Sequence, residues 1–260
     1  MYHCGFDIGS RTGKIVVIGS GDEIVFSNVV PSISSAISTY EKLLSSIPEN
    51  FRNDILSSTV TGYGRESVSS KVNYNATEIT CHFLGVKKKY PDIGTIIDIG
   101  GQDSKVITIR KDGSIKDFAM NDRCAAGTGR FVEVMCERIG FSISEFADLD
   151  VEGIETVPIN STCTVFAESE VISLLSKGVE PLTVASSLAK MAAWNTFNMA
   201  KKLHPSPPFF MSGGVSFLKP VVYHLKKLFK SDIIQDSESQ IMGGYGAALF
   251  GKSKFQSGVS

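Results

Sequence analysis

The sequence lacks an excess of charge of either sign, and it lacks a long apolar run. With 26 basic and 27 acidic side chains the formal net charge is −1, which gives no electrostatic reason to expect nucleic acid or an anionic membrane as a partner. Apolar stretches such as IIDIG and FFM are far too short to span a bilayer. Because the opening MYHCGFDIGS has no signal-peptide pattern, we expect a cytoplasmic protein.

The cysteines form no CxxC pair and are odd in number. The sequence holds five of them: Cys4, Cys81, Cys124, Cys136 and Cys163. An odd number without an export signal argues against a disulfide framework, so we expect reduced thiols or metal ligands. A length of 260 residues, with 42% hydrophobic and 20% charged residues, is typical of one or two compact globular domains.

Two stretches of the sequence resemble each other at a constant offset of 91 residues. They are FDIGSRTGKIVVIGSGDEIV, beginning at Phe6, and IDIGGQDSKVITIRKDGSIK, beginning at Ile97. Asp7 corresponds to Asp98, and the lysine that follows seven residues later recurs as well. Each copy predicts a strand, a tight polar turn, a second strand, a further turn and a third strand.

The polar turns of the repeat carry groups that suit phosphate. Glycine lets backbone N–H groups approach an anion closely, lysine and hydroxyl groups add donors, and the aspartate can hold a hydrated divalent cation. A DIG sequence alone is also compatible with an ordinary strand end and turn. Because the pattern occurs twice in register, the sequence favours two hairpins that clamp a polyphosphate.

Patterns outside the hairpins predict further elements. Cys81 and His82 lie in one of the expected helices and are interpreted as core packing. The glycines in PPFFMSGGV follow a buried strand, where α/β folds often place a nucleotide; a plain tight turn is the alternative. Helices are expected over about 32–47, 77–90, 163–175, 181–203 and 240–251, and strands over about 55–61 and 207–215.

Cys124 and Cys163 each precede a sequence that predicts a helix, and we expect each at the start of that helix. The N-terminus of a helix lowers the pKa of a thiol and favours a bound anion. A cubane iron–sulfur cluster is anionic and takes four thiolates, which a symmetric dimer could supply from two cysteines per subunit. Cys136 fits poorly, because it lies about 18 Å further along the same helix. Two core residues, or a redox pair within one chain, are equally open at this stage.

Five motifs together resemble a known family: NDRCAAGTGRF, STCTVFAESEVISLLSKG, TGYGR, DIGGQDSK and GGYGAALFG. They are similar to ATP-dependent activators of 2-hydroxyacyl-CoA dehydratases, within the BadF/BadG/BcrA/BcrD family of benzoyl-CoA reductase ATPase subunits. The resemblance implies an α/β fold of the actin, Hsp70 and sugar-kinase type. Two ribonuclease-H-like halves, each a mixed sheet flanked by helices, would span residues 1–92 and 93–260, with helix 240–251 able to pack back on the first half.

The resemblance also implies cofactors and the residues that bind them. A homodimer would hold one [4Fe-4S] cluster through Cys124 and Cys163 of each subunit. Asp7 and Asp98 would hold hydrated Mg²⁺, and Gln102 or Asp103 would position the attacking water. The phosphates of ATP or ADP are expected at Ser10, Arg11, Thr12, Gly13, Lys14, Gly100, Gly101, Gln102 and Asp103, and the nucleoside at Gly213, Gly214, Gln240 and Gly243.

The first phosphate loop departs from the pattern of the resembling proteins. Relatives often have STASK or STATK, whereas this chain has SRTGK. The side chain of Arg11 would lie beside the phosphates or point to solvent, and the sequence leaves both open. Thr12 and Lys14 are retained, which supports nucleotide binding.

The function implied by the resemblance is electron transfer driven by ATP. A reduced ferredoxin or flavodoxin would supply an electron, and ATP turnover would change the angle between the helices that follow Cys124 and Cys163. The electron would pass to a 2-hydroxyacyl-CoA dehydratase, or alternatively to benzoyl-CoA reductase or a double-cubane cluster protein. Such an exposed cluster suits an anaerobic setting. Glu168 is a weaker candidate for coupling, with a solvated helix charge as the simpler interpretation. A small-molecule kinase and a non-enzymatic iron–sulfur sensor are the competing classes.

Overall fold

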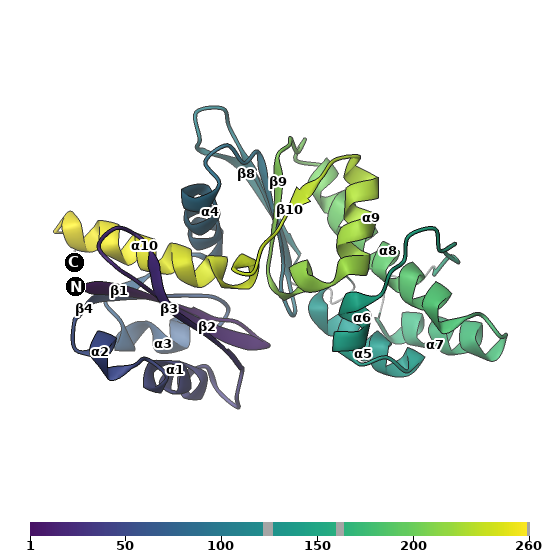
Figure 1. Ribbon diagram of the computed structural model, residues 1–260, viewed down its shortest axis with the longest axis horizontal. Helices are drawn as coiled ribbons and strands as arrows, with labels where there is room; N and C mark the ends of the chain where they lie inside the picture. Colours follow the sequence, from purple (N-terminus) through teal and green to yellow (C-terminus); the bar gives the residue numbers. More distant parts are fainter. Residues whose placement is uncertain (122–126, 160–163, 259–260) are drawn as a thin grey trace. The chain divides into compact units, whose positions relative to one another are not determined.

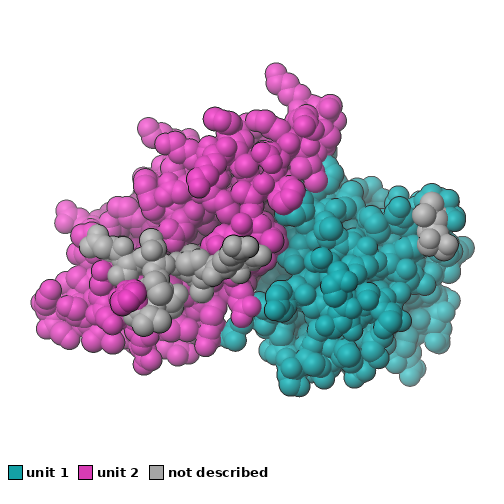
Figure 2. Space-filling view, turned by 180° about the vertical axis from the view of Figure 1, so that it is seen from behind, with its two compact units in different colours: residues 1–93, 237–260 teal, residues 94–236 magenta. Residues whose placement is uncertain are grey.

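The computed structural model describes residues 1–121, 127–159 and 164–258, which form two compact units (Figures 1 and 2). Unit 1 combines Met1–Ile93 with Ser237–Ser260, and unit 2 is Gly94–Asp236. The closing helix of the sequence therefore belongs to unit 1. Within the described residues, no helix combines the length and the apolar character that crossing a membrane requires.

Unit 1 contains a mixed five-stranded sheet with the order β3-β2-β1-β4-β5. The first three strands are antiparallel neighbours, whereas β4 lies parallel to β1 and β5 parallel to β4. The strands are β1 (Tyr2–Ile8), β2 (Thr12–Ile18), β3 (Ile24–Pro31), β4 (Ile55–Thr61) and β5 (Tyr74–Asn75).

Unit 2 repeats this topology with its own five strands. Its sheet has the order β10-β9-β6-β7-β8, so antiparallel hairpin neighbours again lead into two parallel strands. The strands are β6 (Thr95–Ile99), β7 (Ser104–Ile109), β8 (Ile115–Asn121), β9 (Phe209–Ser212) and β10 (Ile233–Ile234).

The repeat extends to the pairing of individual residues. Asp7 lies opposite Lys14, and Asp98 lies opposite Lys105, at the same place in the two hairpins. The register also shifts at equivalent points, between Val17/Ile18 in one unit and Thr108/Ile109 in the other. Both shifts obey the offset of 91 residues found in the sequence. Two mixed sheets flanked by helices confirm the predicted α/β class.

Helices pack around each sheet. In unit 1, α10 (Met242–Gln256) packs against β1, β2, β4 and α4 (Glu78–Lys89), and α1 (Ala36–Ser45) contacts the three hairpin strands. In unit 2, α8 (Pro181–Lys201) packs against α5, α9, β7 and β8. The other helical segments are α2 (Glu49–Arg52), α3 (Arg65–Val68), η1 (Ser69–Lys71), α5 (Gly129–Ile139), α6 (Ile143–Asp148), α7 (Thr164–Ser176), η2 (Gly214–Phe217), α9 (Lys219–Phe229) and η3 (Ser239–Ile241).

The helix and strand predictions agree with these bounds to within a few residues. The strand expected over 55–61 is β4, and the helices expected over 77–90 and 181–203 are α4 and α8. The helix expected over 32–47 is shorter, because Ser35 caps it by accepting a hydrogen bond from the Ser38 amide. The closing helix, expected over 240–251, begins at Met242 and continues to Gln256.

Glycines allow α10 to approach β1 and α4 at backbone distance. A Cβ atom on Gly5 would lie 2.1 Å from the carbonyl oxygen of Gly244. A Cβ atom on Gly246 would lie 1.7 Å from the carbonyl oxygen of Cys81 in α4. Since carbonyl groups of packed elements cannot yield as a side-chain end can, this packing requires glycine at positions 5 and 246. Figure 1 shows α10 running beside the sheet of unit 1.

A buried histidine joins α8 and α9 in unit 2. The Nε2 atom of His224 lies 3.1 Å from the hydroxyl oxygen of Ser186. Burial lowers the pKa of His224 from its usual 6.5 to about 4, and the positive charge of Lys190 acts in the same direction. The imidazole is therefore neutral in the folded protein near neutral pH.

We expect Gly246→Ala to destabilise the protein, because an added methyl group in this contact forces backbone apart. The free energy of unfolding should fall by about 2–3 kcal/mol, as for overpacked cores, measured by urea unfolding. Ser253→Ala is a matched control, since Ser253 is an exposed residue of the same helix and its change should stay within about 0.5 kcal/mol. Equal stability of the two variants would contradict this close crossing of α10 and α4.

The lowered pKa of His224 predicts a loss of stability in mild acid. Between pH 6.5 and pH 4 the unfolded chain binds a proton that the folded protein does not, so stability falls as the pH falls through this window. From pH 7 to pH 5 the contribution is about 2 kcal/mol. In His224→Gln, whose side chain does not titrate, urea unfolding at the two pH values should show a loss smaller by that amount. His204→Asn, which removes an exposed imidazole, is the control; an unchanged pH dependence in His224→Gln would refute the assignment.

Candidate functional site

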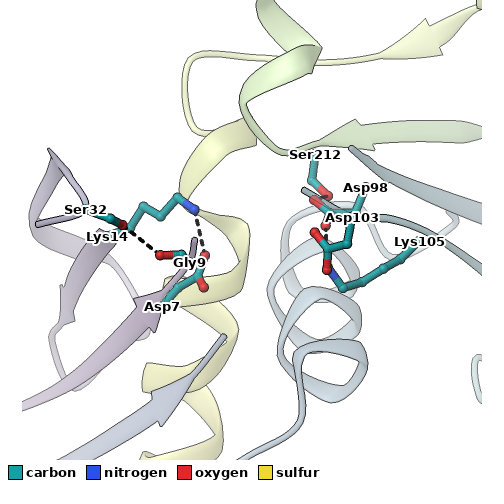
Figure 3. A network of polar contacts seen from close by, with 8 residues as sticks. All are labelled: Asp7, Gly9, Lys14, Ser32, Asp98, Asp103, Lys105 and Ser212. Carbon is teal, nitrogen blue, oxygen red and sulfur yellow. Dashed lines mark hydrogen bonds and ion pairs between the residues drawn. The ribbon is translucent and has the colours of Figure 1, made fainter. Parts of the chain in front are cut away.

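The first polar turn of unit 1 is closed by an ion pair and by contacts with the residue that follows β3. The Nζ atom of Lys14 lies 3.1 Å from Oδ2 of Asp7, and both side chains are largely buried (Figure 3). The hydroxyl of Ser32 donates to the carbonyl oxygen of Gly9 at 2.7 Å, and its amide donates to the carbonyl oxygen of Arg11 at 2.9 Å. These bonds fix the backbone of the turn and leave the ammonium group of Lys14 beside a carboxylate.

The equivalent turn of unit 2 holds two carboxylates around one lysine. The Nζ atom of Lys105 lies 3.3 Å from Oδ2 of Asp98 and 2.6 Å from Oδ2 of Asp103. The hydroxyl of Ser212, at the end of β9, donates to Oδ1 of Asp98 at 2.9 Å (Figure 3). The sequence repeat aligns Lys105 with Lys14 and predicts both as phosphate donors, whereas the sequence predicts no role for Ser212.

The other predicted phosphate residues occupy the two turns with different exposure. Arg11 and Gln102 are exposed, which makes them the accessible side chains of their turns. Gly13 is buried in β2, and its Cβ would lie 2.5 Å from Thr39 of α1. Ser10, Thr12, Gly100 and Gly101, which are predicted for the same role, are partly buried. Their roles in phosphate binding stay predictions.

Each strand-end aspartate is covered by a glycine from the parallel neighbour strand. Gly62 follows β4 with a φ of 94°, and its Cβ would lie 2.6 Å from Oδ1 of Asp7. Gly213 follows β9 with a φ of 84°, and its Cβ would lie 2.9 Å from Oδ1 of Asp98. The left-handed backbone and the close approach both demand glycine here. The glycines of TGYGR predict a turn after the strand, but the sequence does not show that Gly62 is equivalent to Gly213.

The residues predicted to bind the nucleoside divide between the units. Gln240 lies in η3 of unit 1, and Gly213 and Gly214 lie at the start of η2 in unit 2. Gly243 is in α10, where a Cβ atom would lie 2.9 Å from Nε2 of His82 and 3.1 Å from Oδ2 of Asp7. Contact of these residues with one nucleoside therefore stays a prediction.

His82 and Cys81 are interpreted from the sequence as core packing. Cys81 is fully buried, in agreement with that interpretation. The imidazole of His82 is 5% exposed, yet its Nε2 atom and the Asp7 carboxylate both approach the same point on α10. The only sequence signal was the position of His82 in an amphipathic helix, and that signal does not specify a neighbour of Asp7.

The second turn is hydrogen-bonded to the first residues of α5. The amide of Gly129 donates to the carbonyl oxygen of Gly100 at 2.9 Å, and the amide of Arg130 donates to that of Gly101 at 2.8 Å. These amides belong to the N–H groups that every helix N-terminus leaves without an intrahelical acceptor. The turn and the helix consequently share two backbone contacts.

The prediction that Cys124 begins a helix is wrong in its position. The helix begins five residues later, at Gly129. Gly127 has a left-handed backbone with a φ of 93°, and Thr128 is an extended N-cap residue. Cys124 itself lies outside the described residues.

An ion pair links α5 to α7, the helix that follows Cys163. Nε of Arg138 lies 2.7 Å from Oε1 of Glu168, and the two helices pack against each other. The side chain of Glu168 is only 29% exposed, so a simple solvated charge does not describe it. The helix predicted to begin near Cys163 starts at Thr164; Cys163, like Cys124, lies outside the described residues.

The three cysteines that the structure describes are poor metal ligands. Cys4, Cys81 and Cys136 are buried free thiols, and burial raises the pKa of each to about 12. Thiolates, not thiols, bind metals, so these side chains are unsuited to a cluster. Among residues 1–121, 127–159 and 164–258, no group of three or more His, Cys, Asp or Glu residues could hold a metal ion.

Two mixed five-stranded sheets, each flanked by helices, form an α/β fold that this chain shares with sugar kinases. A ROK family glucokinase from Streptomyces griseus, solved with glucose and AMPPNP, has this fold with a TM-score of 0.63. The alignment covers 97% of this chain and all of that one at 14% identity, which shows the fold alone.

Sequence comparison then places the chain within this class. It belongs to the BadF/BadG/BcrA/BcrD ATPase family, whose profile matches residues 4–251. The activator of lactoyl-CoA dehydratase from Anaerotignum propionicum is 40% identical over 253 residues, which cover 96% of this chain and 97% of that protein. The family predicted from the motifs is thus confirmed.

Two solved structures are similar over nearly the whole chain. Component A of (R)-2-hydroxyglutaryl-CoA dehydratase from Acidaminococcus fermentans has a TM-score of 0.92 at 35% identity, covering 98% of this chain and 99% of that one. The activator of 2-hydroxyisocaproyl-CoA dehydratase from Clostridium difficile, with bound ADPNP, has a TM-score of 0.90 at 36% identity, covering 99% and 97%.

The position of Gly243 predicts that an added methyl group disturbs Asp7. In Gly243→Ala the Cβ must displace His82 or the Asp7 carboxylate, and we expect ATP hydrolysis to fall about tenfold, the effect of about 1.4 kcal/mol. Gly244→Ala is the matched control, because its Cβ would meet the side chain of Val16 instead. Steady-state ATPase rates and melting temperatures of both variants separate catalysis from stability. Wild-type hydrolysis by Gly243→Ala would show that this contact does not control Asp7.

Proposed function

We propose that this protein is an ATP-hydrolysing activator that passes one low-potential electron to a 2-hydroxyacyl-CoA dehydratase. The observation that carries the proposal is the pair of hydrogen bonds from the first amides of α5 to the carbonyls of Gly100 and Gly101. These bonds connect a turn suited to phosphate with the helix that follows Cys124. Family membership and 40% identity to a dehydratase activator support the same function.

The nucleotide side of the mechanism uses the two Asp–Lys turns. Lys14, 13% exposed, is paired with a single carboxylate and can turn its ammonium group to a phosphate oxygen. Asp7 beside it would hold hydrated Mg²⁺, a cation that usually binds through one or two carboxylates while keeping waters. Asp103 or Gln102 in the second turn would orient the water that attacks the γ-phosphate.

Coupling would run through unit 2. Loss of the γ-phosphate would change what the second turn contacts, and the amides of Gly129 and Arg130 would transmit a displacement of that turn to α5. The ion pair of Arg138 with Glu168 would carry the displacement to α7. Two hydrogen bonds and one ion pair would therefore relate nucleotide turnover to the helices that follow Cys124 and Cys163.

Cys124 and Cys163 would hold the redox group. The described cysteines are buried thiols, which leaves these two as the chain's candidates for thiolate ligands. Two subunits of a homodimer together supply the four thiolates that one [4Fe-4S] cluster requires. When bound, the cluster would supply one-electron transfer from a reduced ferredoxin or flavodoxin to the partner enzyme.

The kinase alternative rests on the fold alone. The ROK glucokinase shares the architecture at 14% identity, whereas the dehydratase activator is 40% identical over nearly the full length of both chains. Hydrolysis of ATP without a phosphorylated acceptor, in step with activation of a dehydratase, would distinguish the proposed activator from a kinase.

Separate substitutions should remove cluster binding and ATP hydrolysis independently. Anaerobically purified Cys124→Ser and Cys163→Ser should lose the cluster, so that iron falls from about four per dimer to less than about one, while nucleotide binding persists. Asp7→Asn should keep its iron and lose at least about tenfold in ATPase rate. Iron analysis, ATPase assays and activation of a purified dehydratase measure these effects. A full iron content in either serine variant would refute the ligand assignment.

A further inference from the structure

Lys105 is a buried ammonium group between two carboxylates, and neither the repeat nor the proposed electron transfer explains that arrangement. We propose that Lys105 is a positioning residue, which holds the carboxylate of Asp103 in place for the attacking water. This inference rests on the proposed ATP hydrolysis and deepens it. It assigns Asp98 chiefly to holding Lys105.

Burial separates Lys105 from its counterpart in unit 1. The side chain of Lys14 is 13% exposed, and that of Lys105 is 2% exposed. A lysine that is almost completely enclosed cannot reach a phosphate without leaving its carboxylates. Asp103, by contrast, is 25% exposed and is the accessible member of the group. The arrangement therefore presents a carboxylate to solvent and keeps the cation behind it.

A chain of polar contacts anchors Asp103 to the sheet. The hydroxyl of Ser212 in β9 donates to Asp98 in β6, and Asp98 contacts Lys105 in β7. The ammonium group then reaches Oδ2 of Asp103 at 2.6 Å (Figure 3). Residues on three adjacent strands thus fix the orientation of Asp103. A side chain on a turn without such contacts would be held less precisely.

Comparison of the two repeats shows that the turn of unit 2 contains an aspartate that the turn of unit 1 lacks. At the offset of 91, Asp103 corresponds to Thr12, whereas both aspartates at the strand ends and both lysines are retained. Unit 1 has one lysine for one carboxylate, and unit 2 has one lysine for two. The surplus carboxylate is the one that is accessible, as a group that acts on water or on a hydrated cation must be.

The test is a cycle of variants that keeps the buried charge balanced. Lys105→Met alone would remove the ammonium group that lies 3.3 Å from the buried carboxylate of Asp98, and breaking such a buried pair is strongly destabilising. Asp98→Asn with Lys105→Met removes both charges and leaves an amide that can still accept from Ser212. This double change is made in the natural background and in an Asp103→Asn background. ATPase kcat, the Kd for MgADP and the melting temperature are measured for all four proteins.

We expect the double change to lower kcat at least about tenfold when Asp103 is present and less than about twofold in the Asp103→Asn background. The Kd for MgADP should change less than about threefold in both backgrounds. A loss of structure, by contrast, would also weaken MgADP binding. A double variant with wild-type kcat would show that Lys105 only neutralises Asp98. Equal losses in both backgrounds would show that Lys105 acts without Asp103, and either result overturns the proposal.

Two controls keep the result interpretable. If the double variant does not fold, Asp98→Asn with Lys105→Gln replaces it in the same cycle, since the glutamine amide is uncharged but polar. If the wild-type protein binds MgADP but hydrolyses no ATP, the proposed function fails and this inference fails with it. If the wild type hydrolyses ATP and the cycle shows no coupling, only the role of Lys105 is refuted.

Discussion

The pairing of an aspartate with a lysine across the first hairpin is the interaction on which both units depend. Because Asp7 lies opposite Lys14, and Asp98 opposite Lys105, each carboxylate is fixed at the end of a central strand rather than on a flexible loop. Burial of such a charge costs several kcal/mol unless it is paired, so the lysine is needed for the fold. The glycines that follow β4 and β9 then close over each carboxylate and leave no room for a Cβ atom.

The two copies of this arrangement differ in the exposure of the lysine and in the number of carboxylates that it contacts. In unit 1 the lysine is partly accessible and has one carboxylate, which suits a contact with phosphate. In unit 2 the lysine is enclosed, the turn gains an acid, and the turn's carbonyls accept hydrogen bonds from α5. The duplicated hairpin thus has a partly accessible lysine in one copy and backbone hydrogen bonds to a helix in the other.

The sequence could predict the hairpins that recur along the chain, but not the contacts between residues that are distant in the sequence. The offset of 91 residues was sufficient to find both hairpins. Three features depend on which elements are neighbours in space. They are the contact of Lys105 with Asp103, the position of His82 near Asp7, and the equivalence of Gly62 with Gly213. The start of α5 at Gly129 was misplaced because nothing in the sequence shows that Gly127 adopts a left-handed backbone and Thr128 an extended one.

The place of α10 has a consequence for the order in which the molecule is assembled. This helix covers β1 and α4 of unit 1, but the ribosome reaches it only after all of unit 2 has been synthesised. The face of β1 around Gly5 therefore stays open to chaperones, or to wrong partners, while the middle of the chain is already able to fold. Unit 2 can therefore fold before unit 1 is complete.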